Sequence, residues 1–377
     1  MAAFVFGQRS DVERSFHALY HTTLSITFRE FALGRGSYEH CLTLGSLARC
    51  LSMGGQPAAA EKQLREALNV IDALIRQQPD NQSYVRERGI SLGYLGNALS
   101  DQGKYSQARE AYENALQIFR QLGDLRSQSV ASEHLGTLAL AQRDYTEARS
   151  RYMTALKIDH DLSEPSMEAV IWHQLGRVAQ EQKEWGEAER CYRESLAIEE
   201  RLGNAAGAAM TCNQLANVAK NSGRPDEAEG WYKRALELDE LVRPGSPDST
   251  YLNNLANLLV IEVDAGRAAR TRLAEARSYA ERALAIRETL DASSEIWKTL
   301  NILAKIADLE GRAEEARDYR HRERETFAAF EGNRYHIDRQ HGQLIAAIAA
   351  AVIRIRAPTY NFALFYEACS SGTRLCF

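Results

Sequence analysis

Leucines followed by a small residue recur along the chain at nearly constant intervals. Seven such pairs stand in stretches rich in Ala, Leu, Glu, Arg and Gln, which are strong helix formers. Successive pairs lie 48, 40, 40, 40, 40 and 48 residues apart. They are Leu47-Ala48, Leu95-Gly96, Leu135-Gly136, Leu175-Gly176, Leu215-Ala216, Leu255-Ala256 and Leu303-Ala304. A sustained period of this length predicts a repeat architecture.

A second pair, Ala-Leu or once Ser-Leu, follows in register, 20 residues after the Leu in the first five repeats. Before it, each repeat has another small residue, at Ala60, Ala108, Ala148, Ala188, Ala228, Ala276 and Ala316. Four residues after this alanine, on the same helical face, a tyrosine usually follows, as at Tyr112, Tyr152, Tyr192 and Tyr232. The pattern predicts two helices per repeat, packed as a hairpin. The Gly or Ala after each Leu is then small because the neighbouring helix crosses close to the backbone.

Turn-forming residues separate the predicted helices. Within repeats these include Gly103 and the run Gly223-Arg224-Pro225, where proline suits the first turn of a helix. Between repeats, capping residues predict where the next hairpin begins. These are Asp80, Asp124, Ser163, Asn204 and Asp248.

This order of residues resembles the tetratricopeptide repeat over residues 38–331. Repeats two to five match best, and the segment GYLGNALSDQGKYSQAREAYENAL (93–116) is nearly the family consensus. The repeats are longer than the family's usual length and are similar to those of kinesin light chains and the Leu-Gly-Asn-repeat scaffold that orients spindles. The resemblance implies an all-α, right-handed solenoid of about seven hairpins. Residues 266–272 are an insertion that should enlarge the loop of repeat six.

The two ends depart from the repeat. Residues 1–37 contain an amphipathic segment at 10–33, which we expect to cap the first hairpin, because solenoids need polar caps. A remnant of a preceding domain is the alternative. Residues 332–356 include the apolar run LIAAIAAAVIRI and should form a C-terminal capping helix, with a contact between copies of the chain as the alternative. Residues 357–377 have no period and form an irregular tail.

Composition narrows the class of protein. A net charge of −5 and a pI near 6.1 argue against an electrostatic nucleic-acid binder. The six cysteines include no CxxC pair, and the N-terminus has no signal-peptide pattern. The most apolar run has about ten residues, whereas a membrane span needs about 20. We therefore expect a cytoplasmic protein that binds neither nucleic acid nor membrane.

Candidate chemistry is sparse. His17 and His21 have the four-residue helical spacing that can chelate a metal, and His336, Asp338 and His341 form a looser group, but neither group has a complete ligand set. The sequence has no phosphate loop, nucleophile elbow, zinc-protease motif or dinucleotide fingerprint. The expectation is a protein with no cofactor, no metal and no enzymatic activity.

The resemblance places a binding groove on the concave face, lined by the first helix of each hairpin. Counting two residues before, and two and five after, each Leu predicts its exposed residues. These are Asn97, His173, Arg177, Asn213, Asn217, Lys220, Asn253, Asn257, Asn301 and Lys305. An asparagine amide both donates and accepts, so it can pair with a peptide backbone, and the cations favour carboxylates. The prediction is a scaffold that binds an extended acidic peptide of a partner protein.

Two alternatives remain open at this point. The asparagines could instead bond across adjacent hairpins and satisfy buried polar groups. The whole array could be the sensor arm of a larger signalling or defence system whose effector is on another chain. Several hydrogen bonds and charge pairs predict an affinity of order micromolar, and the sequence shows no obvious apolar anchors in the groove.

Overall fold

A computed structural model describes residues 36–289 and 295–329. The chain divides into two units, residues 1–330 and 331–377, and every described residue lies in the first. All regular structure within the described ranges is helical. The predicted caps at 10–33 and 332–356 and the tail at 357–377 lie outside these ranges.

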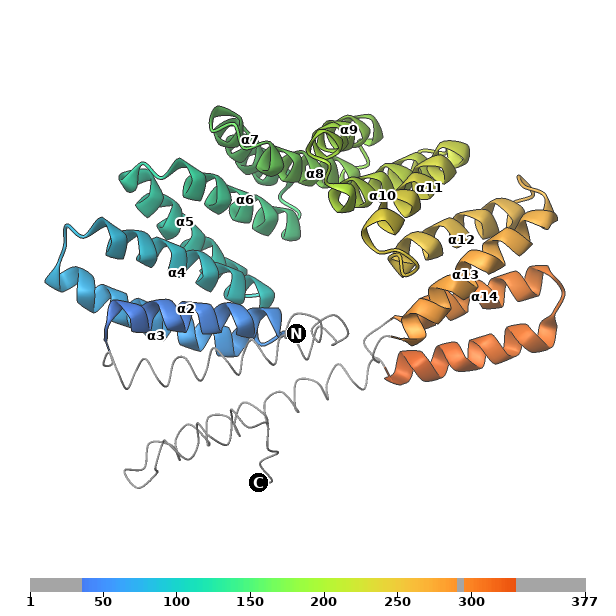
Figure 1. Cartoon of the computed structure of the whole chain (residues 1–377), viewed down its shortest axis with the longest axis horizontal. Helices are drawn as coiled ribbons and strands as arrows, with labels where there is room; N and C mark the ends of the chain where they lie inside the picture. The colour runs from blue at the N-terminus through green and yellow to red at the C-terminus, as the bar shows by residue number, and fades with distance from the viewer. Residues whose placement is uncertain (1–35, 290–294, 330–377) are drawn as a thin grey trace, which may run out of the picture. The chain divides into compact units, whose positions relative to one another are not determined.

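Seven helical hairpins follow one another in chain order (Figure 1). Their first helices are α2 (Tyr38–Met53), α4 (Gln82–Asp101), α6 (Leu125–Ala141), α8 (Pro165–Glu181), α10 (Ala205–Asn221), α12 (Ser249–Asp264) and α14 (Ile296–Leu309). Their second helices are α3 (Pro57–Gln77), α5 (Tyr105–Leu122), α7 (Tyr145–Asp161), α9 (Trp185–Leu202), α11 (Pro225–Val242), α13 (Leu273–Glu288) and the helical residues 313–329. The predicted all-α solenoid is confirmed.

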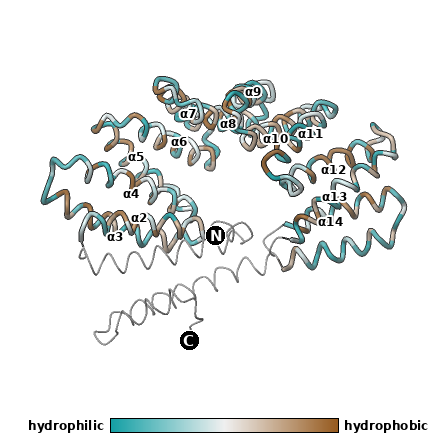
Figure 2. Tube along the Cα trace, viewed as in Figure 1, coloured by the Kyte–Doolittle hydropathy of each residue, from teal (hydrophilic) through white to brown (hydrophobic). Residues whose placement is uncertain are grey.

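Each helix packs against its neighbours in the chain. A first helix contacts the second helix of its own hairpin, and that second helix contacts the next first helix. Clusters of buried hydrophobic residues therefore span adjacent hairpins. Hydrophobic and hydrophilic stretches alternate along the helices in Figure 2, as amphipathic helices require. No helix within the described residues is long and apolar enough to cross a membrane.

The small residue after Leu is explained by the tyrosine of the second helix. A Cβ atom at Gly176 would lie 2.6 Å from Cε1 of Tyr192, and one at Gly136 would lie 2.8 Å from Cε1 of Tyr152. Both tyrosines are fully buried. The close approach predicted from the sequence is therefore a contact between an aromatic ring and bare backbone inside hairpins two, three and four.

The observed helix ends confirm most of the predicted turn and capping residues. Asp124, Asn204 and Asp248 cap α6, α10 and α12 through their side chains, and Pro225 begins α11. Two predicted caps are wrong. Asn81, not Asp80, caps α4. Glu164 precedes α8, while Ser163 takes a left-handed conformation with φ 55° and ends the preceding turn.

The insertion in repeat six forms a loop that ends in a short 3-10 helix, η3 (Arg270–Arg272). Arg272 donates two hydrogen bonds to Glu229 of the preceding hairpin, with nitrogen–oxygen distances of 2.7 and 2.8 Å. The predicted enlargement of this loop is therefore present, and its last residue holds α11 and α13 together.

Candidate functional site

Four positions on each first helix share one face of that helix. They lie five before, two before, two after and five after the Leu of the Leu-Gly/Ala pair, with spacings of three and four residues. We call the surface formed by these positions on successive first helices the first-helix face. In α8 they include Val170, His173 and Arg177, and in α10 they are Met210, Asn213, Asn217 and Lys220.

The prediction that the position two before Leu is exposed is wrong in three hairpins. His173, Asn213 and Asn253 are buried. The Nδ1 atom of His173 lies 3.2 Å from Oγ1 of Thr211 on the next first helix. Burial, with a smaller contribution from nearby Arg177, lowers the pKa of His173 to about 4, so the imidazole is neutral at pH 7.

The two buried asparagines also bond to neighbouring hairpins. Asn213 accepts a hydrogen bond of 2.8 Å from the amide of Asn254 in α12. Asn253 donates one of 2.9 Å to the hydroxyl of Thr299 in α14. These contacts match the alternative of bonds across adjacent hairpins, because an interior amide needs partners that neighbouring helices supply.

The position two after Leu is more accessible and is oriented by tyrosine. The Oδ1 atom of Asn97 accepts a 2.6 Å hydrogen bond from the hydroxyl of Tyr112, and Asn217 accepts one of 2.7 Å from Tyr232. With its oxygen bound to tyrosine, the Asn97 amide presents its NH2 group as the remaining donor. Such a donor suits a carbonyl or carboxylate oxygen.

Three cations of the first-helix face, Arg177, Lys220 and Lys305, have no acidic partner in the part of the chain that the structure describes, whereas Lys298 on the same face pairs with Glu295. Arg177 donates only to the amide of Gln174, at 2.8 Å. Lys305 is exposed. Lys220 is partly buried, and the loss of hydration lowers its pKa. These three cations are therefore available to an external carboxylate.

Two predicted residues remain. Asn301 donates a 2.9 Å hydrogen bond to Glu323, within its own hairpin. Asn257 is partly exposed, and no hydrogen bond of its side chain is found among the described residues. The predicted set therefore contains buried bridging residues and more accessible ones, rather than one uniform row.

A set of charged residues on the second helices was missed by the sequence interpretation. The residue directly after each of the first six repeat alanines carries a charge and bonds to the next hairpin. These residues are Glu61, Arg109, Arg149, Glu189, Glu229 and Arg277. We call them the junction charges. Their signal in the sequence is the fixed spacing itself, 48, 40, 40, 40 and 48 residues.

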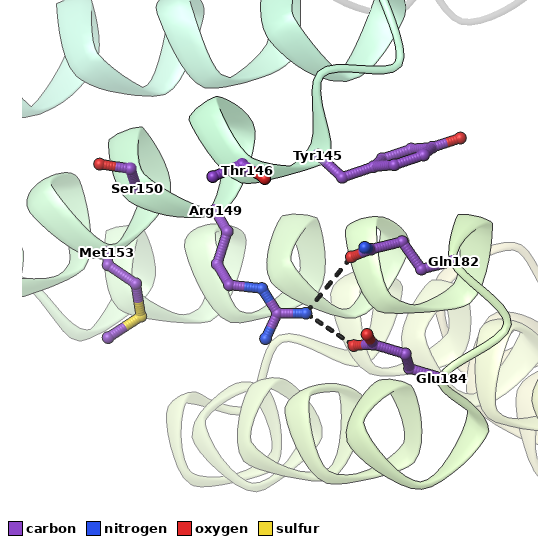
Figure 3. A pocket seen from close by; sticks show the side chains of 7 residues that line it. All are labelled: Tyr145, Thr146, Arg149, Ser150, Met153, Gln182 and Glu184. Atoms are coloured by element: carbon purple, nitrogen blue, oxygen red, sulfur yellow. Dashed lines mark hydrogen bonds and ion pairs between the residues drawn. The ribbon is translucent and has the colours of Figure 1, made fainter.

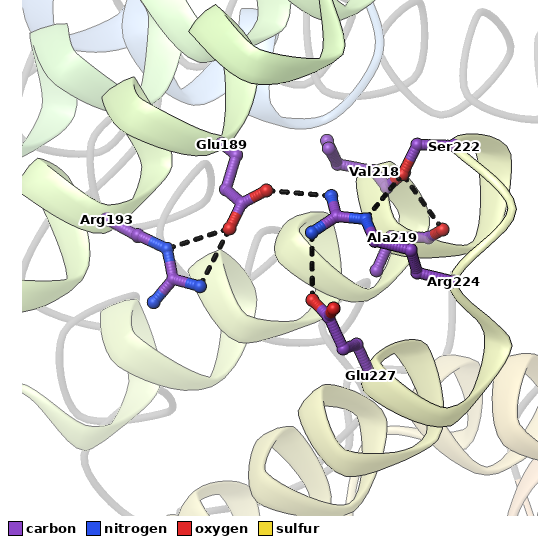
Figure 4. A network of polar contacts seen from close by, with 7 residues as sticks. All are labelled: Glu189, Arg193, Val218, Ala219, Ser222, Arg224 and Glu227. Carbon is purple, nitrogen blue, oxygen red and sulfur yellow. Dashed lines mark hydrogen bonds and ion pairs between the residues drawn. The ribbon is translucent and has the colours of Figure 1, made fainter.

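Figure 4 shows one junction in detail. Glu189 of α9 accepts a 2.7 Å hydrogen bond from Arg224, at the turn of the next hairpin, and is also held by Arg193 of its own helix. Arg224 further donates to Glu227 and to the hydroxyl of Ser222. Hydrogen bonds from both arginines keep the pKa of Glu189 low despite its partial burial.

A shallow hollow of about 380 Å³ adjoins another junction (Figure 3). It lies between α7 and the turn that joins α8 to α9, with Tyr145 and Met153 among its lining residues. Arg149 within it is bound to Glu184 at 2.8 Å and to Gln182 at 3.4 Å. Its one cation is thus occupied by the protein itself.

Metal ligands are not clustered in the described part of the chain. The described residues contain no group of three or more His, Cys, Asp or Glu side chains that could hold a metal ion. Burial raises the pKa of the Cys41, Cys191 and Cys212 thiols to about 12, so none is a thiolate at neutral pH. The histidine groups at His17/His21 and His336/His341 lie outside the described ranges.

Comparisons with known proteins agree with this architecture. A tetratricopeptide repeat family model matches residues 87–160 and 167–241. The chain is similar to BtubC (BKLC) from P. vanneervenii, with 22% identity, coverage of 60% of this chain and 92% of that one, and a TM-score of 0.53. A search of curated proteins finds no match.

Two further solved structures share the fold. The apo form of the quorum sensor NprR from B. thuringiensis is 14% identical, covers 86% of this chain and 91% of its own, and has a TM-score of 0.55. A signal transduction ATPase from Pyrococcus horikoshii with a tetratricopeptide repeat sensor is 14% identical, with a TM-score of 0.62 over 78% of this chain and 44% of that one. Residues 87–160 and 167–241 thus match the tetratricopeptide repeat family, and the solved structures share the helical fold.

Proposed function

We propose that the first-helix face binds an extended, acidic segment of a partner protein. The observation that carries this proposal is the contrast between two sets of cations. The junction charges Arg109, Arg149 and Arg277 each pair with a glutamate of the next hairpin. Arg177, Lys220 and Lys305 on the first helices have no such partner among the described residues. An acidic ligand would supply the missing carboxylates.

The amides add directional contacts to this electrostatic attraction. Asn97 and Asn217 are held by tyrosine hydroxyls, so less side-chain freedom is lost when they bind. Asn257 would contribute in the same row. The buried His173, Asn213 and Asn253 would act indirectly, by fixing the spacing between adjacent first helices. The proposed function is therefore non-catalytic recognition of a peptide segment.

A pull-down from source lysate with mass spectrometry tests the proposal. The test variant is Arg177→Ala/Lys220→Ala/Lys305→Ala. Its matched control is Arg120→Ala/Lys157→Ala/Arg201→Ala, which removes three exposed second-helix cations that lack ion pairs within the described residues. Both variants change the net charge equally.

We expect a partner that wild type and the control variant capture and that the first-helix variant loses. Capture should also weaken as salt rises from 50 to 500 mM, because screening acts on exposed charges. Equal capture by both variants would place the interaction elsewhere on the chain and refute the proposal.

A further inference from the structure

The position five before Leu carries an apolar side chain in the first five hairpins. These residues are Leu42, Ile90, Val130, Val170 and Met210. In hairpins six and seven the same position is polar, with Thr250 and Lys298. We call the five apolar residues the apolar row. They recur at the repeat spacing, so they occupy equivalent places on successive first helices.

The apolar row does not belong to the core. Val170 and Met210 are 38% and 49% exposed, and Leu42, Ile90 and Val130 are only partly buried. The positions on either side of the row are buried, yet several of them hold hydroxyl side chains, at Ser91, Ser129 and Thr211. This inverts the usual pattern, in which apolar residues are buried and polar ones exposed. Packing within the array therefore does not account for the row.

The apolar row and the cations share one surface. Val170 lies seven residues before Arg177 on α8, which is two helical turns, or about 10 Å along the helix. Met210 and Asn217 have the same relation on α10. The first-helix face thus has an apolar edge on the N-terminal side of these helices and a polar, cationic edge on the other.

We propose that the apolar row is the docking surface for the apolar side chains of an acidic, amphipathic segment of a partner protein. This inference rests on the proposed function and names the chemistry of its ligand. Charge complementarity decides the occupant. Arg177 and Lys220 lie nearer the C-terminal ends of the two helices that carry Val170 and Met210, and neither has an acidic partner among the described residues, so they favour a ligand with carboxylates. A second copy of the chain bound symmetrically through this face would bring like charges together.

The ligand carries apolar residues along one edge and aspartate or glutamate along the other. Apolar anchors at Val170 and Met210 supply the contacts that the sequence interpretation did not find in the groove. Burying exposed side chains of this size stabilises a complex in addition to its hydrogen bonds. Binding is then tighter than the micromolar affinity expected from polar contacts alone.

The experiment uses a display library of random 15-residue peptides, selected on the immobilised full-length chain. The test variant is Val170→Thr/Met210→Gln, which keeps side-chain size and removes apolar character. The control variant is Met153→Gln/Leu202→Gln, at second-helix residues that are 50% and 42% exposed. Circular dichroism melts of both variants verify that they fold.

We expect enriched peptides to combine acidic residues with regularly spaced apolar ones. Their affinity should fall about tenfold or more in the test variant and less than twofold in the control. If the enriched peptides are acidic but lack spaced apolar residues, and the test variant binds them as tightly as wild type, the docking role of the apolar row is refuted. The proposed function is not refuted by that result. Enrichment that Arg177→Ala/Lys220→Ala does not weaken would overturn both. Sedimentation velocity showing a dimer that the test variant abolishes would also overturn the inference, in favour of a second copy.

Discussion

Contacts inside a hairpin and contacts between hairpins are built differently. Inside hairpins two, three and four, glycine meets tyrosine each time, as in Gly136 with Tyr152 and Gly176 with Tyr192. Between hairpins, the junction charge changes sign along the array. Glu61, Glu189 and Glu229 are acids that bind cations of the next hairpin, whereas Arg109, Arg149 and Arg277 are cations that bind acids.

The contacts that repeat and the contacts that vary specify different properties of the fold. A repeated contact defines the folding unit, because the two helices of each hairpin must pack closely against each other. A contact whose charges vary distinguishes one junction from another, because pairing a hairpin with the wrong neighbour would place like charges together. Repetition therefore specifies the hairpin, and variation helps to specify the order of hairpins.

The largest effect is expected from a change inside a hairpin. In Gly176→Ala the new Cβ would meet the buried ring of Tyr192, which should lower the free energy of unfolding by about 1–3 kcal/mol. Gly230→Ala in α11 is the matched control, since nothing lies within 4 Å of its Cβ position. Alanine there should raise stability by up to about 1 kcal/mol. Urea denaturation followed by circular dichroism measures both, and equal midpoints would contradict the assigned packing.

A smaller loss is expected at a junction. Hydrogen bonds from Arg272, and secondarily from Lys233, lower the pKa of Glu229 to about 2. Glu229→Gln should reduce the free energy of unfolding by about 1 kcal/mol at pH 7, a value discounted for partial exposure. Because the folded pKa lies below the usual 4.5, this contribution is present above pH 4.5 and disappears as pH falls toward 2. Glu237→Gln, on the exposed side of the same helix, should have no comparable effect.

The smallest effect should have the opposite sign. Glu199 is buried near Gly207 at the link between α9 and α10, and its Oε2 atom has no hydrogen-bond partner among the described residues. Burial raises its pKa, so its charge opposes folding at neutral pH. Glu199→Gln should raise the urea midpoint at pH 7, and this gain should vanish below the usual glutamate pKa of 4.5 because wild-type Glu199 is then protonated as well. A lower midpoint at pH 7 would mean that the carboxylate has a favourable partner.

Much of the fold could be predicted because its signals are local. The Leu-Gly pairs, the alanines and the tyrosines repeat at a fixed spacing, and the family resemblance follows from them. Caps were less predictable. Asp80 and Asn81 are adjacent and chemically similar, and only the backbone path selects Asn81 as the cap of α4. Ser163 resembles a cap in sequence but occupies a left-handed turn, as Gly123 and Gly203 do in neighbouring hairpins.

The candidate site was predicted only in part, for a related reason. Counting from each Leu correctly selects one face of a helix, but it cannot tell how deeply the neighbouring first helix covers that face. His173, Asn213 and Asn253 lie where the next hairpin covers them, while Asn97 and Asn217 lie beyond it against a tyrosine hydroxyl. The residues of the apolar row recur at the repeat spacing in the sequence, but their exposure to solvent is known only from the structure.

The sequence by itself determined that this chain folds as a tandem array of helical hairpins, because helix period and close packing act within about 40 residues and are written into each repeat. Among the described residues, the tertiary structure alone decided which polar side chains bridge hairpins, which cations have no acidic partner, and which apolar side chains are exposed. Those properties depend on the distance and angle between successive hairpins, and that geometry is a sum over many contacts that no single repeat contains.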